Sequence, residues 1–587
     1  MKKLASYLKR YTKESILAPL FKLLEVVFDL MVPLVVARMI NIGVAGNDRG
    51  YMVRCFLILI LMALLGLAAS ITAQFFAAKA STGFAADLRQ AVFDHIQGFS
   101  FTELDTLGAD TMITRLTDDI NQVQTGVNMG LRLLLRSPFV VFGAMIMAFT
   151  IDVSCAWVFA VVIPVLFVAV FAIMLSSIPL YRKAQSALDR VTCLTRENLT
   201  GVRVIRAFCR EDHSVREFDE SSQALTKLNE FVGRISALLN PLTYVLINLA
   251  AVVLIDRAAL RVNIGSIAQG DVVALNNYML QITVELIKLA SLIITLTKSM
   301  ACAGRVAGVL EQPTSMTYPE KNAQPRENGD EAVRFDRVNF TYRNAGAPSL
   351  TDISFCAGKG QTVGIIGGTG SGKSTLISLI PRFYDAASGT VCLDGCNVKE
   401  YTQEALCRKV AVVQQRSVLF QGTIRDNLRW GNENASDEEL WQALEVAQAR
   451  EIVEGKEGQL DFRLEQGGRN LSGGQKQRLS IARAIAKNPK VYLFDDSFSA
   501  LDYKTDVTLR RALKAQTDNA TVIIVAQRIS TVLHANQILV LDEGRLVGKG
   551  THAQLMVSCP EYQEIARSQL SQKELDLESL NTEKEGE

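Results

Sequence analysis

The stretch GGTGSGKS, residues 367–374, decides how the second half of this chain folds. It fits the pattern G-x-x-x-x-G-K-[ST], follows the β-branched run QTVGII and leads into the helix-patterned run STLISLIPRFY. In this strand–loop–helix context, glycines let backbone N–H groups close around a phosphate, and the start of the helix favours the anion. The sequence therefore predicts a phosphate-binding loop, in which Lys373 reaches the β- and γ-phosphates and Ser374 holds Mg²⁺.

The apolar runs around this loop indicate an α/β domain. The runs QTVGIIG, KVAVVQQ, KVYLF and TVIIVAQ alternate with helical patterns, as in a largely parallel sheet. The run KVYLF leads into Asp495, which suits a carboxylate that orients Mg²⁺. An aspartate at a strand end is by itself more often a helix cap, but the phosphate loop favours the metal role here.

The first 310 residues carry long apolar runs. The chain is 49% hydrophobic although 21% of its residues are charged, which indicates an apolar membrane part joined to a polar part. A helix needs about 20 residues to cross a bilayer. The run LRLLLR (131–136) extends a short span, with its arginines near the interface. The six predicted spans are 15–45, 55–78, 137–151, 153–181, 235–255 and 272–297.

Charges near the ends of the spans predict their orientation. Five basic residues precede the first span and favour a cytoplasmic N-terminus; they are Lys2, Lys3, Lys9, Arg10 and Lys13. No cleavable signal peptide is predicted. The polar connections 79–130 and 182–234 are expected to continue the membrane helices into the cytoplasm. Arg257 and Arg261 fit less well, because they follow the fifth span on the predicted outer side.

Composition predicts the organisation of the whole chain. We expect a transmembrane domain over 1–310, a linker over 311–330, a nucleotide-binding domain over 331–570 and a charged, mobile tail over 571–587. The net charge of +2 gives no argument for nucleic acid as a partner. Ten scattered cysteines, with only Cys392 and Cys396 close together, do not predict a zinc site.

One more stretch points to a family. NLSGGQKQRLSIARAI, residues 470–485, resembles the signature of ABC transporters, in which serine and glycine at a helix start offer a hydroxyl and bare N–H groups to a phosphate. The resemblance covers residues 1 to about 570. It implies an α-helical, six-span transmembrane domain of the ABC exporter type, fused to a cytosolic α/β P-loop ABC ATPase domain. The signature residues are Leu471, Ser472, Gly473, Gly474 and Gln475.

The resemblance also implies roles for single residues, with ATP and Mg²⁺ as cofactors. Tyr342 matches the aromatic that stacks on adenine, Gln415 the glutamine that senses magnesium and the membrane domain, and Asp502 ends a segment that crosses to the facing subunit. The stretch 201–212 resembles an inner loop that docks onto the opposite nucleotide domain. The resemblance implies that Ser374, Gln415 and Asp495 contact magnesium. The loop residues implied to bind nucleotide are Gly367, Gly368, Thr369, Gly370, Ser371, Gly372, Lys373, Ser374 and Thr375.

Two residues depart from the family pattern. Asp496 stands where a glutamate usually orients the attacking water, and Gln527 stands where a histidine usually contacts the γ-phosphate. An aspartate carboxylate falls back by roughly 1 Å, and such a misplacement can cost about 10²-fold in rate. Glutamine can donate a hydrogen bond but cannot carry the imidazolium charge. The chain's own site is therefore expected to bind Mg-ATP and to hydrolyse it poorly.

An intact signature beside a weakened site implies a partner. The resemblance is to the degenerate-site subunit of bacterial heterodimeric multidrug exporters, paired with a second half-transporter that carries the glutamate and histidine. It implies a multi-pass protein of the cell membrane with cytoplasmic termini, which moves amphipathic small molecules. Alternatives are an importer built on the exporter fold, or an ATP-gated channel or regulatory protein, although no long charged regulatory insert is visible.

Ionisable residues inside the predicted spans mark a candidate substrate pathway. Glu25 and Asp29 are four residues apart in the first span, and Glu285 and Lys288 are three apart in the sixth, so each pair shares a helix face. Such groups usually face a bundle interior or a wet cavity. Interhelical ion pairs with a purely structural role are an equally good interpretation.

Overall fold

The computed structural model describes residues 2–322, 330–343, 345–516 and 520–569. The predicted tail 571–587 and the linker residues 323–329 lie outside the described residues. The chain divides into two compact units. The first comprises Met1–Gln97 and Ala109–Gln312, and the second comprises Gly98–Gly108 and Pro313–Glu587.

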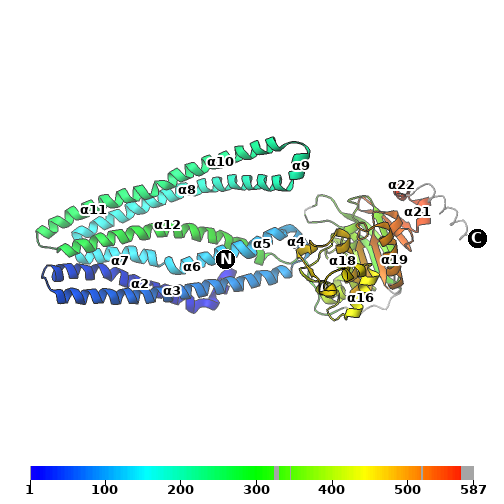
Figure 1. Cartoon of the computed structure of the whole chain (residues 1–587), viewed down its shortest axis with the longest axis horizontal. Coiled ribbons are helices and arrows are strands. Elements are labelled where there is room, and N and C mark those ends of the chain that lie inside the picture. Colours follow the sequence, from blue (N-terminus) through cyan, green and yellow to red (C-terminus); the bar gives the residue numbers. More distant parts are fainter. Residues whose placement is uncertain (1, 323–329, 344, 517–519, 570–587) are drawn as a thin grey trace, which may run out of the picture. The chain divides into compact units, whose positions relative to one another are not determined.

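The first unit is a bundle of long helices that run side by side (Figure 1). Its elements in chain order are α1 (Lys2–Leu8), η1 (Lys9–Tyr11), α2 (Thr12–Arg38), η2 (Met39–Val44), α3 (Arg49–Gln97), α5 (Ala109–Thr114), η3 (Arg115–Asp119), α6 (Ile120–Leu133), α7 (Arg136–Ile151), α8 (Val153–Thr200), α9 (Val202–Ala207), α10 (Glu211–Ala237), α11 (Leu239–Asn263) and α12 (Gln269–Glu311).

Five helical stretches of the described chain are long and apolar enough to cross a membrane. Helix α2, the predicted first span, misses this criterion because Lys22, Glu25 and Asp29 interrupt its apolar run. It packs along α3 in the same bundle. The helices also continue beyond their apolar parts as expected, since α3 and α8 are 49 and 48 residues long. The five stretches are Arg49–Gln97, Ala109–Ile151, Val153–Thr200, Glu211–Asn263 and Gln269–Glu311.

The second unit contains the predicted parallel sheet. Its strands lie in the order β12-β11-β3-β10-β9-β6, and all neighbours are parallel except β11 and β12. A separate antiparallel sheet of order β2-β1-β4-β5 was not predicted from the sequence. The strands are β1 (Glu331–Phe340), β2 (Leu350–Gly358), β3 (Thr362–Gly367), β4 (Ser388–Leu393), β5 (Cys396–Asn397), β6 (Val410–Val413), β7 (Gly422–Thr423), β8 (Arg463–Leu464), β9 (Val491–Asp495), β10 (Thr521–Val525), β11 (Gln537–Asp542) and β12 (Arg545–Gly550).

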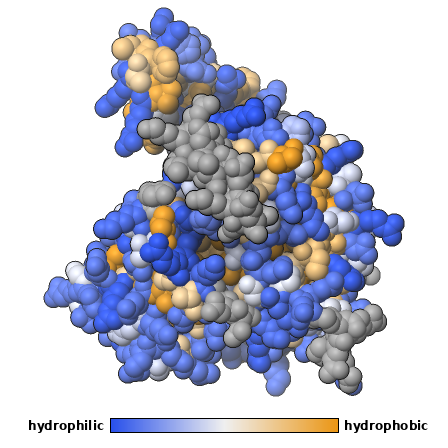
Figure 2. Space-filling model, turned by 90° about the vertical axis from the view of Figure 1, so that its right-hand side faces the viewer, coloured by the Kyte–Doolittle hydropathy of each residue, from blue (hydrophilic) through white to orange (hydrophobic). Residues whose placement is uncertain are grey.

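Helices surround this sheet. They are α4 (Phe101–Leu107), α13 (Lys373–Ser378), η4 (Val398–Glu400), α14 (Gln403–Lys409), α15 (Ile424–Arg429), α16 (Asp437–Val446), α17 (Arg450–Glu454), η5 (Gln459–Asp461), η6 (Gln466–Gly468), α18 (Gly473–Ala486), α19 (Tyr503–Gln516), α20 (Ile529–Val532), α21 (His552–Ser558) and α22 (Pro560–Gln569). The face of the molecule shown in Figure 2 is mainly hydrophilic, with hydrophobic residues in small patches.

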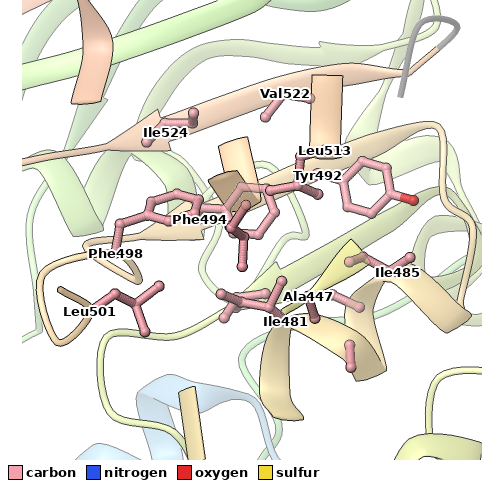
Figure 3. Packing of buried hydrophobic residues seen from close by; sticks show 14 of the residues in the cluster. Ala447, Ile481, Ile485, Tyr492, Phe494, Phe498, Leu501, Leu513, Val522 and Ile524 are labelled. Carbon is pink, nitrogen blue, oxygen red and sulfur yellow. The ribbon is translucent and has the colours of Figure 1, made fainter. Parts of the chain in front are cut away.

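A hydrophobic core fixes the end of β9, where two aspartates follow. Phe494 is fully buried, and its ring lies 5.2 Å from that of Phe498. Figure 3 shows these rings among Ile481 of α18 and Ile524 of β10. Because apolar side chains hold β9 from the helix side and from the next strand, the strand delivers Asp495 and Asp496 to a fixed place at its carboxyl end.

Helix α4 belongs to the second unit, although the sequence analysis grouped its residues with the membrane part. The ring centroids of Phe101 and Phe383 lie 4.4 Å apart. The Tyr384 hydroxyl donates a hydrogen bond of 2.6 Å to Asp105. These contacts explain why the short segment 98–108 clusters with the sheet rather than with α3, which precedes it.

Candidate functional site

The candidate site gathers at the carboxyl ends of four neighbouring parallel strands. The loop 367–374 follows β3, Gln527 follows β10, Asp495 ends β9, and Gln415 follows β6. Ligands of open α/β sheets bind at this edge, because the loops there converge. The topology therefore brings together residues that are more than 100 positions apart in the sequence.

Glycine geometry lets the loop close tightly. Gly370 and Gly372 have φ values of +82° and +93°, a region that other residues rarely adopt. A Cβ atom on Gly372 would lie 2.7 Å from the Ser349 carbonyl oxygen. A side chain at this position would therefore displace the strand entry that supports the loop.

Lys373 lies back across its own loop. Its ammonium donates hydrogen bonds to the carbonyl oxygens of Gly367 and Gly368 at 2.9 and 2.6 Å, and it lies 3.4 Å from the Ser371 hydroxyl. Burial lowers the pKa of this ammonium, and the charges of Asp496 and Asp495 oppose the shift. The cation is thus held at the mouth of the loop.

Ser374 and Asp495 form the predicted magnesium-binding pair. The Ser374 hydroxyl donates a 2.8 Å hydrogen bond to the Asp495 carboxylate. Burial raises the pKa of Asp495, the hydrogen bond from Ser374 opposes the rise, and the charge of Asp496 adds to it. A hydroxyl and carboxylates are oxygen donors, the ligands that Mg²⁺ prefers. The residues present therefore fit that ion.

Asp496 accepts hydrogen bonds from two glutamine amides. Gln527 donates to its Oδ2 at 2.7 Å and Gln415 donates to the same oxygen at 3.2 Å. Asp496 is 7% exposed and has a φ of +47°, so it sits in a strained turn directly after β9. Burial raises the pKa of its carboxyl, and its hydrogen bonds oppose that rise. The structure thus joins the two departures from the family pattern in one contact.

Gln569 is a residue that the sequence analysis missed. Its side chain accepts a 2.8 Å hydrogen bond from the Ile529 backbone N–H and donates a 2.9 Å bond to the Gln527 carbonyl oxygen. It therefore fixes the backbone on both sides of Arg528. Gln569 lies 42 positions from Gln527, in a helix of mixed polarity. No local sequence pattern therefore predicts this contact.

Tyr342 borders a cavity of about 860 Å³ beside the phosphate loop. Its hydroxyl is 3.1 Å from the Thr375 hydroxyl, and the Tyr384 ring packs edge-on against it at 5.3 Å. The other walls include the loop residues 370–375, the entry to β2 and the turn between β11 and β12. The cavity thus connects an aromatic face with a phosphate loop.

The signature residues lie at the start of α18. Ser472 caps this helix, because its hydroxyl accepts from the Gln475 N–H while the Gln475 side chain accepts from the Ser472 N–H. The Ser472 hydroxyl acts as an acceptor there, so its own proton remains available to a further oxygen. Leu471 is buried, and a Cβ on Gly473 would meet nothing within 4 Å. Asp502 accepts from the N–H and hydroxyl of Thr505, as a helix cap does.

The ionisable residues of the predicted pathway form one network in the first unit. Arg136 of α7 lies 2.7 Å from Glu285, 3.1 Å from Asp29 and 3.7 Å from Glu25. Lys22 and Lys288 complete it, with contacts of 2.5 Å to Glu25 and 2.9 Å to Glu285. Three acids and three bases thus join α2, α7 and α12. The shared helix faces of Glu25 with Asp29 and of Glu285 with Lys288 were predicted from the sequence, whereas Arg136 and Lys22 were not predicted as their partners.

Arg261, which fitted the charge pattern poorly, has a partner as well. Its guanidinium donates to Asp152 at 2.9 and 2.7 Å, and Asp152 in turn accepts from the Cys155 N–H at the start of α8. This ion pair ties the end of α11 to the turn between α7 and α8. A structural tether therefore accounts for one of the two outer arginines.

Comparison with known families agrees with this architecture. A model described as the ABC transporter transmembrane region matches residues 15–286, and a model described as ABC transporter matches residues 350–499. An uncharacterized ABC transporter ATP-binding protein of Mycobacterium tuberculosis is 38% identical over 96% of this chain and 97% of its own. The chain belongs to the ABC transporter family.

Further relatives also match over nearly the full length of both chains. An ABC transporter ATP-binding protein of Bacillus subtilis is 35% identical, over 97% of this chain and 98% of its own length. Another B. subtilis relative, provisionally named a multidrug export ATP-binding/permease protein, is 30% identical over 95% of this chain and 97% of its own. The structure of a bacterial Atm1-family ABC exporter with ATP bound has a TM-score of 0.77 at 22% identity, and covers 96% of this chain and 99% of that one. The ABC transporter thus has the fold of an exporter half, with several membrane helices and a cytosolic ATPase domain.

Proposed function

We propose that this ABC transporter is the weakly hydrolysing subunit of a heterodimeric exporter. The observation that carries the proposal is the Asp496 carboxylate, one oxygen of which accepts both the Gln527 and the Gln415 amide. In the family, a longer acid orients the attacking water and a histidine contacts the γ-phosphate. Here the side chains at these two positions, Asp496 and Gln527, are hydrogen-bonded to each other.

Nucleotide binding uses the other half of the same site. The Tyr342 ring offers its face to a base, the loop N–H groups and Lys373 offer charge to the phosphates, and Ser374 with Asp495 offers oxygen ligands to Mg²⁺. ATP oxygens would replace the loop carbonyls as partners of Lys373. Binding is therefore preserved while the step after binding is slow.

Slow hydrolysis at this site leaves most of the turnover to a partner. General-base assistance is typically worth about 10²–10⁴-fold, so a misplaced carboxylate loses much of the rate. The signature around Ser472 has its capping geometry intact and a hydroxyl proton to offer. In our proposal it completes the competent site of a second half-transporter, which carries glutamate and histidine.

The proposed substrates are amphipathic small molecules that leave the cytoplasm through the cell membrane. The multidrug name of one B. subtilis relative supports this class. Within the ion network, Asp29 and Lys288 are the members a substrate can contact, since their side chains are 45% and 44% exposed whereas Glu285 is 5% exposed. Vesicles loaded with a fluorescent amphipathic cation on one side separate export from import, the alternative built on the same fold.

A pair of substitutions tests the division of labour. The tagged chain is purified from its native membrane together with the half-transporter that accompanies it. We expect Gly474→Asp, which crowds the signature helix start, to remove most ATP turnover of the complex, and Asp496→Asn to leave most of it. The opposite pattern, or a chain that purifies without a second half-transporter, would contradict the proposal.

A further inference from the structure

Gln477 of α18 connects this helix to the loop that follows β6. Its side-chain oxygen accepts a hydrogen bond from the Ser417 hydroxyl, and its amide nitrogen donates to the Gln414 carbonyl oxygen at 3.4 Å. These two partners lie on either side of Gln415. Gln477 is 3% exposed, so the loss of a partner would leave a polar atom unpaired in the protein interior, which is unfavourable. The side chain therefore holds the loop and the helix together.

The same helix has the signature at its start. Helix α18 is continuous from Gly473 to Ala486, and Ser472 caps it. Gln477 lies five positions after Ser472, roughly 7.5 Å along the helix axis at about 1.5 Å per residue. Over so short a distance the hydrogen-bonded helix moves as one body. A displacement of Gln477 therefore displaces the Ser472 hydroxyl as well.

The loop also reaches the nucleotide site. Gln415, between the two partners of Gln477, donates a hydrogen bond of 3.2 Å to the Asp496 carboxylate. Its side chain carries an amide oxygen too, and oxygen atoms are the ligands that Mg²⁺ prefers. The loop 414–417 therefore links a carboxylate of the nucleotide site to the helix that begins with the signature.

The start of α18 also packs against the segment that follows Asp496. The Ser499 hydroxyl donates a 2.9 Å hydrogen bond to the Asp496 carbonyl oxygen, which holds this segment to the end of β9. A Cβ atom on Gly474 would lie 3.3 Å from the carbonyl oxygen of Ala500. Because atoms in such close contact leave no space to absorb a shift, a displacement at the nucleotide site is passed on to the helix.

We propose that Gln477 is a positioning residue that couples the nucleotide site of this chain to its own signature. When the site is occupied, Gln415 exchanges its bond to Asp496 for contacts with the ligand, the loop 414–417 moves, and Gln477 moves α18 with it. A site that hydrolyses slowly then keeps the signature in place while a partner turns over. The consequence for a partner rests on the proposed function, whereas the coupling inside this chain does not.

Hydrogen exchange at residues 472–476 tests the coupling in the full-length chain. The chain is placed in nanodiscs that hold one copy each, so that no facing subunit touches the signature, and exchange is measured with and without Mg-ATP. In the wild type we expect Mg-ATP to change the exchange rate about fivefold, the effect of one hydrogen bond. Gln477→Met fills a similar space but offers neither bond. This variant should lose the response while it retains labelled ATP as the wild type does.

Two further variants make this test specific. Ser417→Ala removes a bond of the same contact from a half-buried loop position, so it should lose most of the response without a change in α18. The matched control is Asn427, a buried amide of α15 that bonds the N–H and the carbonyl oxygen of Phe420 further along the same loop. Asn427→Leu should keep the response. A full response in Gln477→Met and Ser417→Ala, an equal loss in Asn427→Leu, or no response in the wild type would overturn the proposal.

A double-mutant cycle extends the test to the complex with the second half-transporter. Gln415→Ala and Gln477→Met should each lower ATP turnover about fivefold, and the double variant should lose little more, because both changes break one connection. Losses that multiply would show two independent effects and would also overturn the proposal. The exchange experiment needs no partner and does not ask which site hydrolyses ATP. Its failure is therefore distinguishable from failure of the proposed function, which the fate of the bound ATP decides.

Discussion

Two clusters of carboxylates in this ABC transporter each contain a buried member, Glu285 in the membrane bundle and Asp496 at the nucleotide site, and the partners of the two clusters differ. In the membrane bundle, Glu25, Asp29 and Glu285 all contact the guanidinium of Arg136. At the nucleotide site, Asp495 and Asp496 accept from a hydroxyl and two amides. Among the residues that the structure describes, no lysine or arginine forms an ion pair with either of these two.

This difference separates charges that stabilise the folded chain from charges that are available to bind a ligand. A buried acid that has an arginine partner is compensated within the chain, and removing the partner leaves it stranded. A buried acid with only neutral donors carries a desolvation cost, visible as the raised pKa of Asp495 and Asp496. A magnesium ion would relieve that cost. We therefore interpret the ion network of the membrane bundle as structural and the two aspartates of the nucleotide site as ligand-binding.

The largest expected effect comes from breaking the membrane network. Arg136→Met should lower the free energy of unfolding of the full chain by about 3–5 kcal/mol, because Glu285 loses its main partner while it stays buried. Thermal unfolding in nanodiscs measures the loss. Lys288→Met, which removes an exposed member of the same network, should cost about 1 kcal/mol or less. Equal losses would mean that Arg136 is not the centre of the network.

A neutral isostere at the nucleotide site should act in the opposite direction. Asp495→Asn keeps the oxygen that accepts from Ser374 but removes a charge that is partly withdrawn from water, so the free energy of unfolding of the nucleotide-free chain should rise by on the order of 1 kcal/mol. The same variant should lose the stabilisation by Mg-ATP, which is about 2.7 kcal/mol for a ligand at 100 times its Kd. Melting curves with and without Mg-ATP check both signs. A lower melting temperature for the variant than for the wild type, both without nucleotide, would contradict the distinction between the two regions.

The smallest effect should come from Gln569. Removing its two hydrogen bonds to the backbone around Arg528 with Gln569→Ala should cost about 1 kcal/mol, because the side chain is exposed and water replaces part of the contact. The segment that carries Gln527 should then become mobile, and hydrogen exchange at 527–529 should rise. Ser568→Ala, which loses only a bond within its own helix, is the control. Unchanged exchange would show that α22 does not position this segment.

The sequence predicted those features that are encoded in short stretches. The phosphate loop, the strand before it and the signature are each recognised within about 16 residues. The parallel direction of β3, β10, β9 and β6 follows from their alternation with helices, whereas their order in the sheet was not predicted. Long-range pairs were not predictable in this way. Arg136 meets Asp29 across 107 positions and Glu285 across 149, and only the packing of three helices brings them together. For the same reason, the docking of α4 in the second unit and the contact of Gln569 with Gln527 have no local signal.

The most direct test of the weak-site proposal follows a single turnover at the site of this chain. The full-length protein in nanodiscs is loaded with labelled Mg-ATP, unbound nucleotide is removed, and the retained nucleotide is identified over time. Wild type should retain mainly intact ATP, whereas the double variant Asp496→Glu, Gln527→His should convert it to ADP about 10²-fold faster, as a correctly placed base would. ADP formation by the wild type at the rate of the double variant would contradict the account.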